Sequence, residues 1–257
     1  MKKYDTIKKD EYKTKDMACD VAFFSTIAIL FILWCFVAIT AFTDNYNEFE
    51  AEDLISLNRE ANDIYVRSSF KIQITYTNEI EYIKKTGSAA VYKYEEGKYY
   101  LLTNKHVIDS ELNDEIKNKE DYRALIIDYS DFAYPLTLEK VSETDDLAII
   151  SFESEKKYQV LEFQSDTKIK KNTQAINISN PLARHNAVEY GYYKGIYKDF
   201  LSFDMACYQG SSGSAVLNNK FEIIGLACES VSFITTDGDE FSYLLAIPLE
   251  KLQEFIK

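Results

Sequence analysis

Short runs of β-branched and aromatic residues recur along most of the chain after residue 65. They read KIQITY, AAVYKY, YYLLTN, ALIIDY, LAIISF, AINIS, FEIIGLA and SYLLAI. Turn-forming segments such as EEGK, NNK and TDGD separate them, and many short strands at this spacing are typical of all-β barrels and sandwiches. No alternation of strands with helices is visible, which argues against an α/β fold. We therefore predict an all-β domain.

Helical patterns flank this region on both sides. The segment PLEKLQEFI, starting at Pro248, predicts a short C-terminal helix with apolar residues on one side. In the acidic stretch 43–65 the apolar residues recur at steps of three and four, which favours a short amphipathic helix that serves as a stalk. These residues are Leu54, Leu57, Ala61 and Ile64.

Residues 21–42 contain no charge, proline or glycine. As a helix they are about 33 Å long, which matches a bilayer core of about 30 Å. A buried core helix would carry a polar stripe, and none is present. A cleaved signal peptide would have a shorter apolar region and a small-x-small site, whereas Ile39 stands where a small residue is needed before Ala41. An uncleaved transmembrane signal anchor is favoured over both alternatives.

The flanking charges predict the orientation of this span. Six lysines lie among residues 1–16, whereas five acidic residues and no basic ones lie between residue 43 and Arg59. The positive-inside rule then makes residues 1–20 a cytoplasmic tail and places residues 43–257 on the far side of the membrane.

The charge and the metal-binding residue types limit the partners. Of the formal net charge of -13, residues 1–16 contribute +2 and the remainder -15, so nucleic acid is excluded as an expected partner. The chain contains four cysteines and two histidines, with no CxxC pair and no Cys/His cluster at zinc spacing. We predict no metal and no cofactor.

Three segments together carry the residues of an activated hydroxyl. The first is TGSAAVY followed by YLLTNKHVI, and it contains His106 in its second part. ETDDLAII contains Asp145 and Asp146, and YQGSSGSAVLN contains Ser211 and Ser212. A serine becomes nucleophilic when an imidazole takes its proton, and a carboxylate orients that imidazole. The order histidine, aspartate, serine excludes an α/β-hydrolase, whose serine precedes its histidine. His185, in a polar loop, is expected to be solvent-exposed.

The segment before Ser212 also suggests an oxyanion hole. Two backbone N–H groups must point at one oxygen atom, and a glycine two residues before the nucleophile tolerates the tight backbone this requires. The N–H groups of Gly210 and Ser212 are the expected donors.

These segments resemble trypsin-like serine peptidases of the chymotrypsin fold, closest to the bacterial HtrA-type branch. The motifs are GSAAV followed by TNKH, then DLAII, then GSSG, and the resemblance covers roughly residues 66–257. It implies two β-barrels, about 66–155 and 156–250, that meet at a cleft. It also implies the catalytic residues His106, Asp146 and Ser212, with Asp145 and Ser211 as rivals for the acid and the nucleophile.

The sequence departs from the family's pattern at several places. Ser211 replaces the usual Asn or Asp before the nucleophile, Ser214 the glycine after the GxSG box, and Ala183 a glycine in the NPLG-like turn. Activation by cleavage in the manner of trypsin zymogens is therefore not expected. No peptide-binding PDZ module is expected after the closing helix.

The resemblance also implies a primary specificity pocket. A small apolar floor at Ala206 favours an uncharged, apolar substrate residue before the scissile bond, and the nearby Glu229 weakens that expectation. Cys207 and Cys228 are expected to be free thiols, with a disulfide as the alternative. The pocket residues are Ala206, Cys207, Ala227, Cys228, Glu229 and Ser230.

The sequence as a whole predicts a membrane-anchored serine endopeptidase that cleaves peptide or protein substrates through an acyl-enzyme. Two rivals remain open. One is a catalytically silent module of the same fold that uses its cleft for binding. The other is a surface adhesion or scaffold module held on a membrane stalk.

Overall fold

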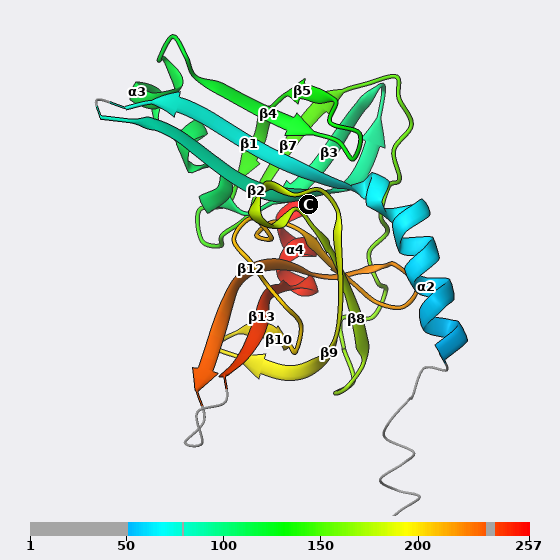
Figure 1. Cartoon of the computed structure of the whole chain (residues 1–257). Helices are drawn as coiled ribbons and strands as arrows, with labels where there is room; N and C mark the ends of the chain where they lie inside the picture. Colours follow the sequence, from blue (N-terminus) through cyan, green and yellow to red (C-terminus); the bar gives the residue numbers. More distant parts are fainter. Residues whose placement is uncertain (1–50, 79, 235–239) are drawn as a thin grey trace, which may run out of the picture. The chain divides into compact units, whose positions relative to one another are not determined.

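The computed structural model describes residues 51–257, apart from residue 79 and residues 235–239. The apolar span predicted at residues 21–42 lies outside them. Among the residues described, no helix is both long and apolar enough to cross a membrane. The helix α2 (Ala51–Asp63) is the first element of the described part of the chain, and Figure 1 shows two β-structures following it.

The first β-structure is a seven-stranded antiparallel sheet of order β5-β4-β1-β2-β3-β7-β6. Its edge strands β5 and β6 are separated in the chain only by Leu136, so the sheet must roll until its two edges meet. The edges are joined by the chain and not by a ladder of hydrogen bonds. The strands are β1 (Ser69–Thr77), β2 (Tyr82–Glu95), β3 (Lys98–Thr103), β4 (Arg123–Ile127), β5 (Ala133–Pro135), β6 (Thr137–Val141) and β7 (Ala148–Glu153).

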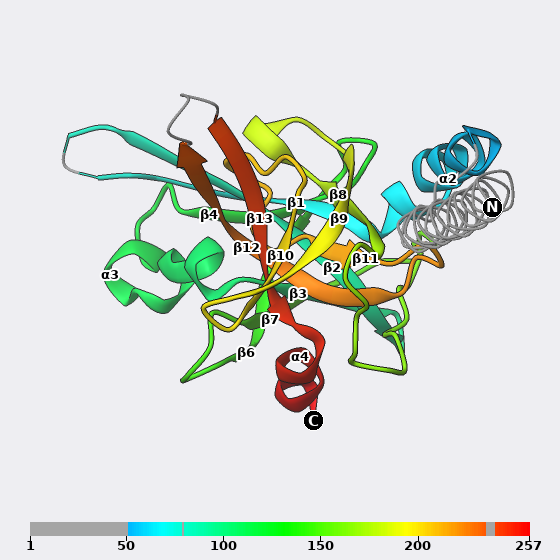
Figure 2. The same cartoon turned by 90° about the horizontal axis from the view of Figure 1, so that it is seen from below.

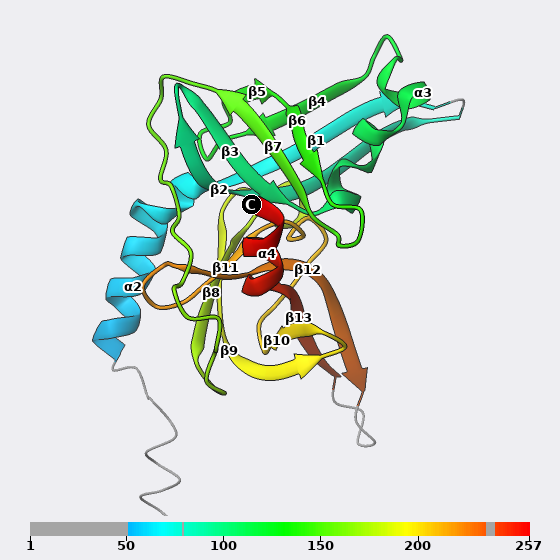
Figure 3. The same cartoon turned by 180° about the vertical axis from the view of Figure 1, so that it is seen from behind.

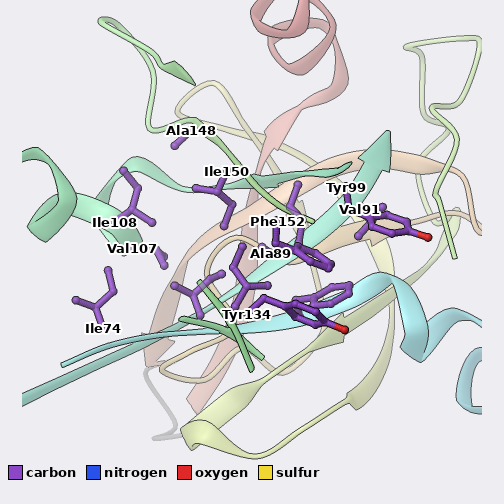
Figure 4. Packing of buried hydrophobic residues seen from close by; sticks show 14 of the residues in the cluster. Ile74, Ala89, Val91, Tyr99, Val107, Ile108, Tyr134, Ala148, Ile150 and Phe152 are labelled. Carbon is purple, nitrogen blue, oxygen red and sulfur yellow. The ribbon is translucent and has the colours of Figure 1, made fainter. Parts of the chain in front are cut away.

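The rolled sheet encloses an aromatic and aliphatic core (Figure 4). Phe70 is fully buried in this core, with its ring centroid 5.1 Å from that of Phe152 and 4.9 Å from that of Tyr158. Tilted and edge-on ring contacts of this kind add to the free energy of area burial. Aromatic side chains fit the pleated surface of a sheet, and here the rolled sheet buries several of them together.

The second β-structure is a closed barrel of order β10-β13-β12-β11-β8-β9. Its interior is packed by side chains such as Phe203, Val216 and Leu244, all fully buried. Figure 2 shows β12 and β13 running side by side. The strands are β8 (Gln174–Ser179), β9 (Ala187–Tyr197), β10 (Phe200–Phe203), β11 (Ala215–Leu217), β12 (Ile223–Ile234) and β13 (Glu240–Pro248).

Helical segments are short and lie on the outside of these β-structures. α4 (Leu249–Ile256) follows Pro248 directly and lies where the first sheet meets the barrel (Figure 3). α2 contacts β9 of the barrel, and its Leu57 and Ala61 are buried. The remaining segments are η1 (Tyr65–Ser68), η2 (Lys105–Leu112), α3 (Asp114–Lys117) and η3 (Pro181–Ala183).

The prediction of an all-β fold with a short C-terminal helix is confirmed. The expectation of two barrels holds in part, because only the second is closed by hydrogen bonds. Proline at the end of β5 supplies no N–H for a ladder to β6, which is consistent with the open seam.

Candidate active site

His106 is held by one carboxylate at two atoms. It lies in η2, directly after β3, and its backbone N–H donates to Oδ1 of Asp146 at 2.9 Å. Its ring Nδ1 lies 2.6 Å from Oδ2 of the same residue. With Nδ1 donating to the carboxylate, the lone pair of Nε2 is left free to act as a base.

This hydrogen bond to Asp146 raises the pKa of His106 above its usual value of 6.5. Burial opposes the shift, whereas the charges of Asp146, Asp109 and Glu229 add to it. Each of these carboxylates stabilises the imidazolium form. These charges therefore favour the protonated form that His106 takes when it accepts a proton.

Ser212 lies in the turn before β11, and this turn is packed against the first sheet. The backbone N–H of Ser88 in β2 donates to the carbonyl of Ser212 at 2.8 Å. Gly213 has φ +88°, and a Cβ there would overlap the Ser88 carbonyl oxygen and lie 2.5 Å from Thr103 Oγ1. Thr103 is the last residue of β3, so the turn reaches the strand that leads into His106.

The hydroxyl of Ser212 donates to the carbonyl of Cys228 in β12 at 3.0 Å. In the part of the chain that the structure describes, Ser212 makes no hydrogen bond to His106. The histidine–aspartate pair and the serine turn are thus brought to one region, and the serine side chain is directed at the barrel. Catalytic hydrogen bonds are often incomplete without substrate.

Two carbonyls orient the N–H groups expected to form the oxyanion hole. The Gln209 carbonyl accepts a hydrogen bond from Leu182 N at 2.7 Å, and the Ser211 carbonyl accepts one from Ser214 N at 3.1 Å. In a trans peptide the C=O and N–H groups point in opposite directions. The N–H of the next residue, Gly210 or Ser212, therefore points away from these contacts. Within the described residues neither N–H donates to another group.

Gly210 is required at its position on two grounds. Its φ is +98°, a conformation that side-chain-bearing residues rarely adopt. A Cβ there would also lie only 2.8 Å from the Asn180 carbonyl oxygen.

The rival residues have other partners. Asp145 contacts Lys251 Nζ at 2.7 Å. Ser211 is 2% exposed, and its hydroxyl lies 3.1 Å from that of Ser179. Asp146, and not Asp145, is therefore the carboxylate bonded to His106. The carbonyl that bonds to Ser88 of the first sheet is that of Ser212, and not that of Ser211.

The expectation that His185 is solvent-exposed is wrong. Only 20% of its side chain is exposed, and Nε2 lies 2.7 Å from both Lys71 Nζ and Asp131 Oδ1. The loop 180–186 folds back onto the first sheet, which places this histidine between a lysine and a carboxylate. Its polar sequence neighbours did not reveal that long-range contact.

The residues expected to line a specificity pocket lie on two adjacent segments. Ala206 and Cys207 are half-buried, Ala227 and Cys228 are buried, and Glu229 and Ser230 are exposed. Cys207 Sγ lies 3.9 Å from the Glu229 carbonyl, which brings the segments together.

Cys207 and Cys228 are free thiols, as expected. Burial raises the pKa of Cys207 to about 11. Burial, with Glu229 and Asp146 nearby, raises the pKa of Cys228 to about 12. Both side chains are therefore uncharged at neutral pH.

Fold and site together define an all-β protein of the chymotrypsin-like class, in which a serine turn of one β-structure meets a histidine–aspartate pair of the other. Comparison with known proteins agrees. Residues 87–226 match the family model described as "Trypsin-like peptidase domain", and the match includes His106, Asp146 and Ser212. The chain belongs to this family.

Curated relatives place it near the HtrA branch. A "Probable periplasmic serine protease do/HhoA-like" of Haemophilus influenzae is 22% identical over 172 residues, covering 62% of this chain and 34% of the relative. A "Probable periplasmic serine endoprotease DegP-like" of Buchnera aphidicola subsp. Baizongia pistaciae is 26% identical over 161 residues, covering 58% and 31%. The chain spans about a third of the length of these relatives.

Sequence reasoning missed the residues that support the serine turn from behind. Ser88, Asn180 and Leu182 all contact it, and none was assigned a role. Ser88 belongs to the motif GSAAV, so a signal was present, but its partner in the turn, Gly210, is 122 positions away.

Proposed function

We propose that this chain is a membrane-anchored serine endopeptidase that uses His106, Asp146 and Ser212 through an acyl-enzyme. The observation that carries the proposal is the two-point contact of Asp146 with His106, which leaves Nε2 available as the base. Membership of the trypsin-like family and the names of the relatives support the same activity.

In the proposed reaction, rotation about the Ser212 Cα–Cβ bond directs Oγ from the Cys228 carbonyl to His106. Oγ attacks the substrate carbonyl while Nε2 takes its proton, and Asp146 stabilises the imidazolium. The N–H groups of Gly210 and Ser212 stabilise the oxyanion. The imidazolium then protonates the leaving amine, and water hydrolyses the ester by the same steps in reverse order.

The proposal includes a preference for an apolar residue before the scissile bond. Ala206 and Ala227 are small and apolar, and the raised pKa values of Cys207 and Cys228 leave both thiols neutral. Glu229 is exposed, so its charge is solvated at the margin of this region.

The test of the activity is covalent labelling by a fluorophosphonate probe, followed by peptide turnover. We expect the wild type to be labelled and Ser212→Ala to be unlabelled, with turnover lowered by about 10³-fold or more. His106→Ala should behave in the same way. Asp145→Asn is the matched control and should retain labelling.

Equal labelling of the wild type and Ser212→Ala would refute the assignment of the nucleophile. A wild type that is folded but neither labelled nor active would favour the silent binding module.

The proposal also places the peptidase domain outside the cytoplasm. The support is the uncharged span at residues 21–42, the lysines that precede it, and the word "periplasmic" in the names of the relatives. A protease added to right-side-out vesicles that carry the full chain should digest residues 43–257 and spare the tail. A protected domain, or a soluble form that begins near Phe42, would contradict this topology.

A further inference from the structure

Ser88 in β2 contacts the serine turn through two donors at once. Its backbone N–H donates to the Ser212 carbonyl at 2.8 Å, and its hydroxyl donates to the Gly210 carbonyl, also at 2.8 Å. The side chain is fully buried. One residue of the first sheet therefore binds two carbonyls of the turn that belongs to the second β-structure.

The local strand pattern explains why Ser88 is available. β2 pairs with β3 only from Ala90 onward, because β3 ends at Thr103. At Ser88 the main-chain ladder with β3 has ended, and from β3 only the Thr103 hydroxyl donates to the Ser88 carbonyl, at 2.8 Å. The serine turn lies on this side of β2. Ser88 donates hydrogen bonds to the carbonyls of the turn from both its main chain and its side chain.

These two carbonyls lie on either side of the peptide unit that carries the Ser212 N–H. The Gly210 carbonyl belongs to the peptide before it, and the Ser212 carbonyl to the peptide after it. The Ser211 carbonyl within that unit is bound by Ser214. Glycine populates positive φ about as readily as negative φ, so the backbone of Gly210 does not by itself fix how the turn is oriented. The orientation of the turn therefore depends on hydrogen bonds such as these at each peptide plane.

The hydroxyl of Ser88 also joins the turn to the loop 180–186. It accepts a hydrogen bond from the Asn180 backbone N–H at 2.9 Å. Leu182 in the same loop donates to the Gln209 carbonyl, which orients the Gly210 N–H. Ser88 is thus linked to the peptide planes of both expected oxyanion donors.

We infer that Ser88 is a positioning residue that holds the oxyanion hole in its working geometry from across the interface between the two β-structures. This inference rests on the proposed peptidase function. Loss of the hydroxyl would leave the Gly210 carbonyl and the Asn180 N–H without partners in a buried place, so the turn would relax. Misplacement of the hole weakens transition-state binding more than substrate binding.

The test is Ser88→Ala in the full chain, beside Ser151→Ala. Ser151 is also fully buried in the first sheet, but its hydroxyl bonds to Glu139 and not to the turn. We expect Ser88→Ala to lower kcat by about 10- to 100-fold with KM within about twofold, which is less than the direct loss of one donor. Ser151→Ala should leave kcat within about twofold.

A second readout separates positioning from general loss of structure. A peptide boronate forms a tetrahedral adduct that occupies the hole, whereas a peptide product does not. In Ser88→Ala, inhibition by the boronate should weaken in proportion to kcat, and inhibition by the product should be unchanged. Ser88→Cys keeps a weak donor and should be intermediate, which serves if Ser88→Ala does not fold.

The outcomes distinguish the two hypotheses. A wild type without serine-dependent activity overturns the proposed function, and the role of Ser88 with it. An active wild type, with Ser88→Ala or Ser88→Cys equal to it in kcat and boronate affinity, overturns only the role of Ser88. Equal weakening of boronate and product would likewise reject positioning of the hole.

Discussion

At the scale of single residues, the proposed chemistry depends on how two neighbouring aspartates differ. Asp146 accepts two hydrogen bonds from His106, whereas Asp145, one position earlier, pairs with Lys251. The pKa of Asp145 is lowered chiefly by the hydrogen bond from Lys251. Adjacent carboxylates thus serve separate purposes, one at the site and one in anchoring the C-terminal helix.

The raised pKa of His106 predicts the acid limb of the pH–rate profile. The base must be neutral, so kcat/KM should fall as pH decreases through a value above 6.5. Asp146→Asn removes the carboxylate that raises this pKa, so the limb should move to lower pH and kcat should fall by about 10⁴-fold. The measurement is kcat/KM over the range from about pH 5 to about pH 9.

Asp145→Asn is the control for this profile, and its acid limb should not move. A wild-type limb at or below the usual histidine value of 6.5 would argue that Asp146 does not stabilise the protonated histidine.

At the scale of elements, α4 contacts both β-structures. Leu249 and Leu252 are buried. On its other side, Lys251 Nζ lies 2.7 Å from Asp145 Oδ1, and the Phe255 carbonyl accepts a hydrogen bond from Lys140 at 2.5 Å. A helix of eight residues is not stable alone, so its order comes from these contacts.

Leu252→Ala should therefore destabilise the whole domain. The side chain is fully buried, and truncating such a leucine costs about 2–5 kcal/mol in free energy of unfolding. Glu254→Ala, on the exposed side of the same helix, should change it by less than about 0.5 kcal/mol. Denaturant unfolding of the two variants measures the difference, and equal losses would show that α4 does not pack as described.

At the scale of the whole molecule, the proposed site lies where the two β-structures touch. His106 and Asp146 come from the first, and Ser212 from the second. At Gly213 the backbones of the two β-structures approach each other very closely, because a Cβ there would overlap the Ser88 carbonyl oxygen. The interface thus sets how far the serine turn stands from the histidine.

Gly213→Ala should separate the two β-structures locally and reduce turnover by about 10²-fold, the effect expected from misplacing reactive groups by about 1 Å. Gly97→Ala is a matched control, because Gly97 has a similar φ of +85° but no atom within 4 Å of the place where a Cβ would stand. It carries the backbone strain without the clash and should keep kcat near wild type. Comparable losses in both variants would trace the effect to strain and not to the interface.

The sequence by itself determined the features that local patterns encode. Strand-forming runs predicted the β-structure, because alternation and β-branched content act over a few residues. Pro248 and the apolar positions after it predicted α4. The motifs around His106, Asp146 and Ser212 identified the family, since reactive residue types and their immediate neighbours are readable in one segment.

Features that depend on contacts between distant segments of the chain followed only from the tertiary structure. It left the first sheet rolled but unclosed, since β5 and β6 meet through Leu136 without a ladder. It placed His185 between Lys71 and Asp131, although its own sequence neighbours are polar. It brought Ser88 to Gly210 across 122 positions. Such pairings are set by how two β-structures pack against each other, and no local periodicity encodes that packing.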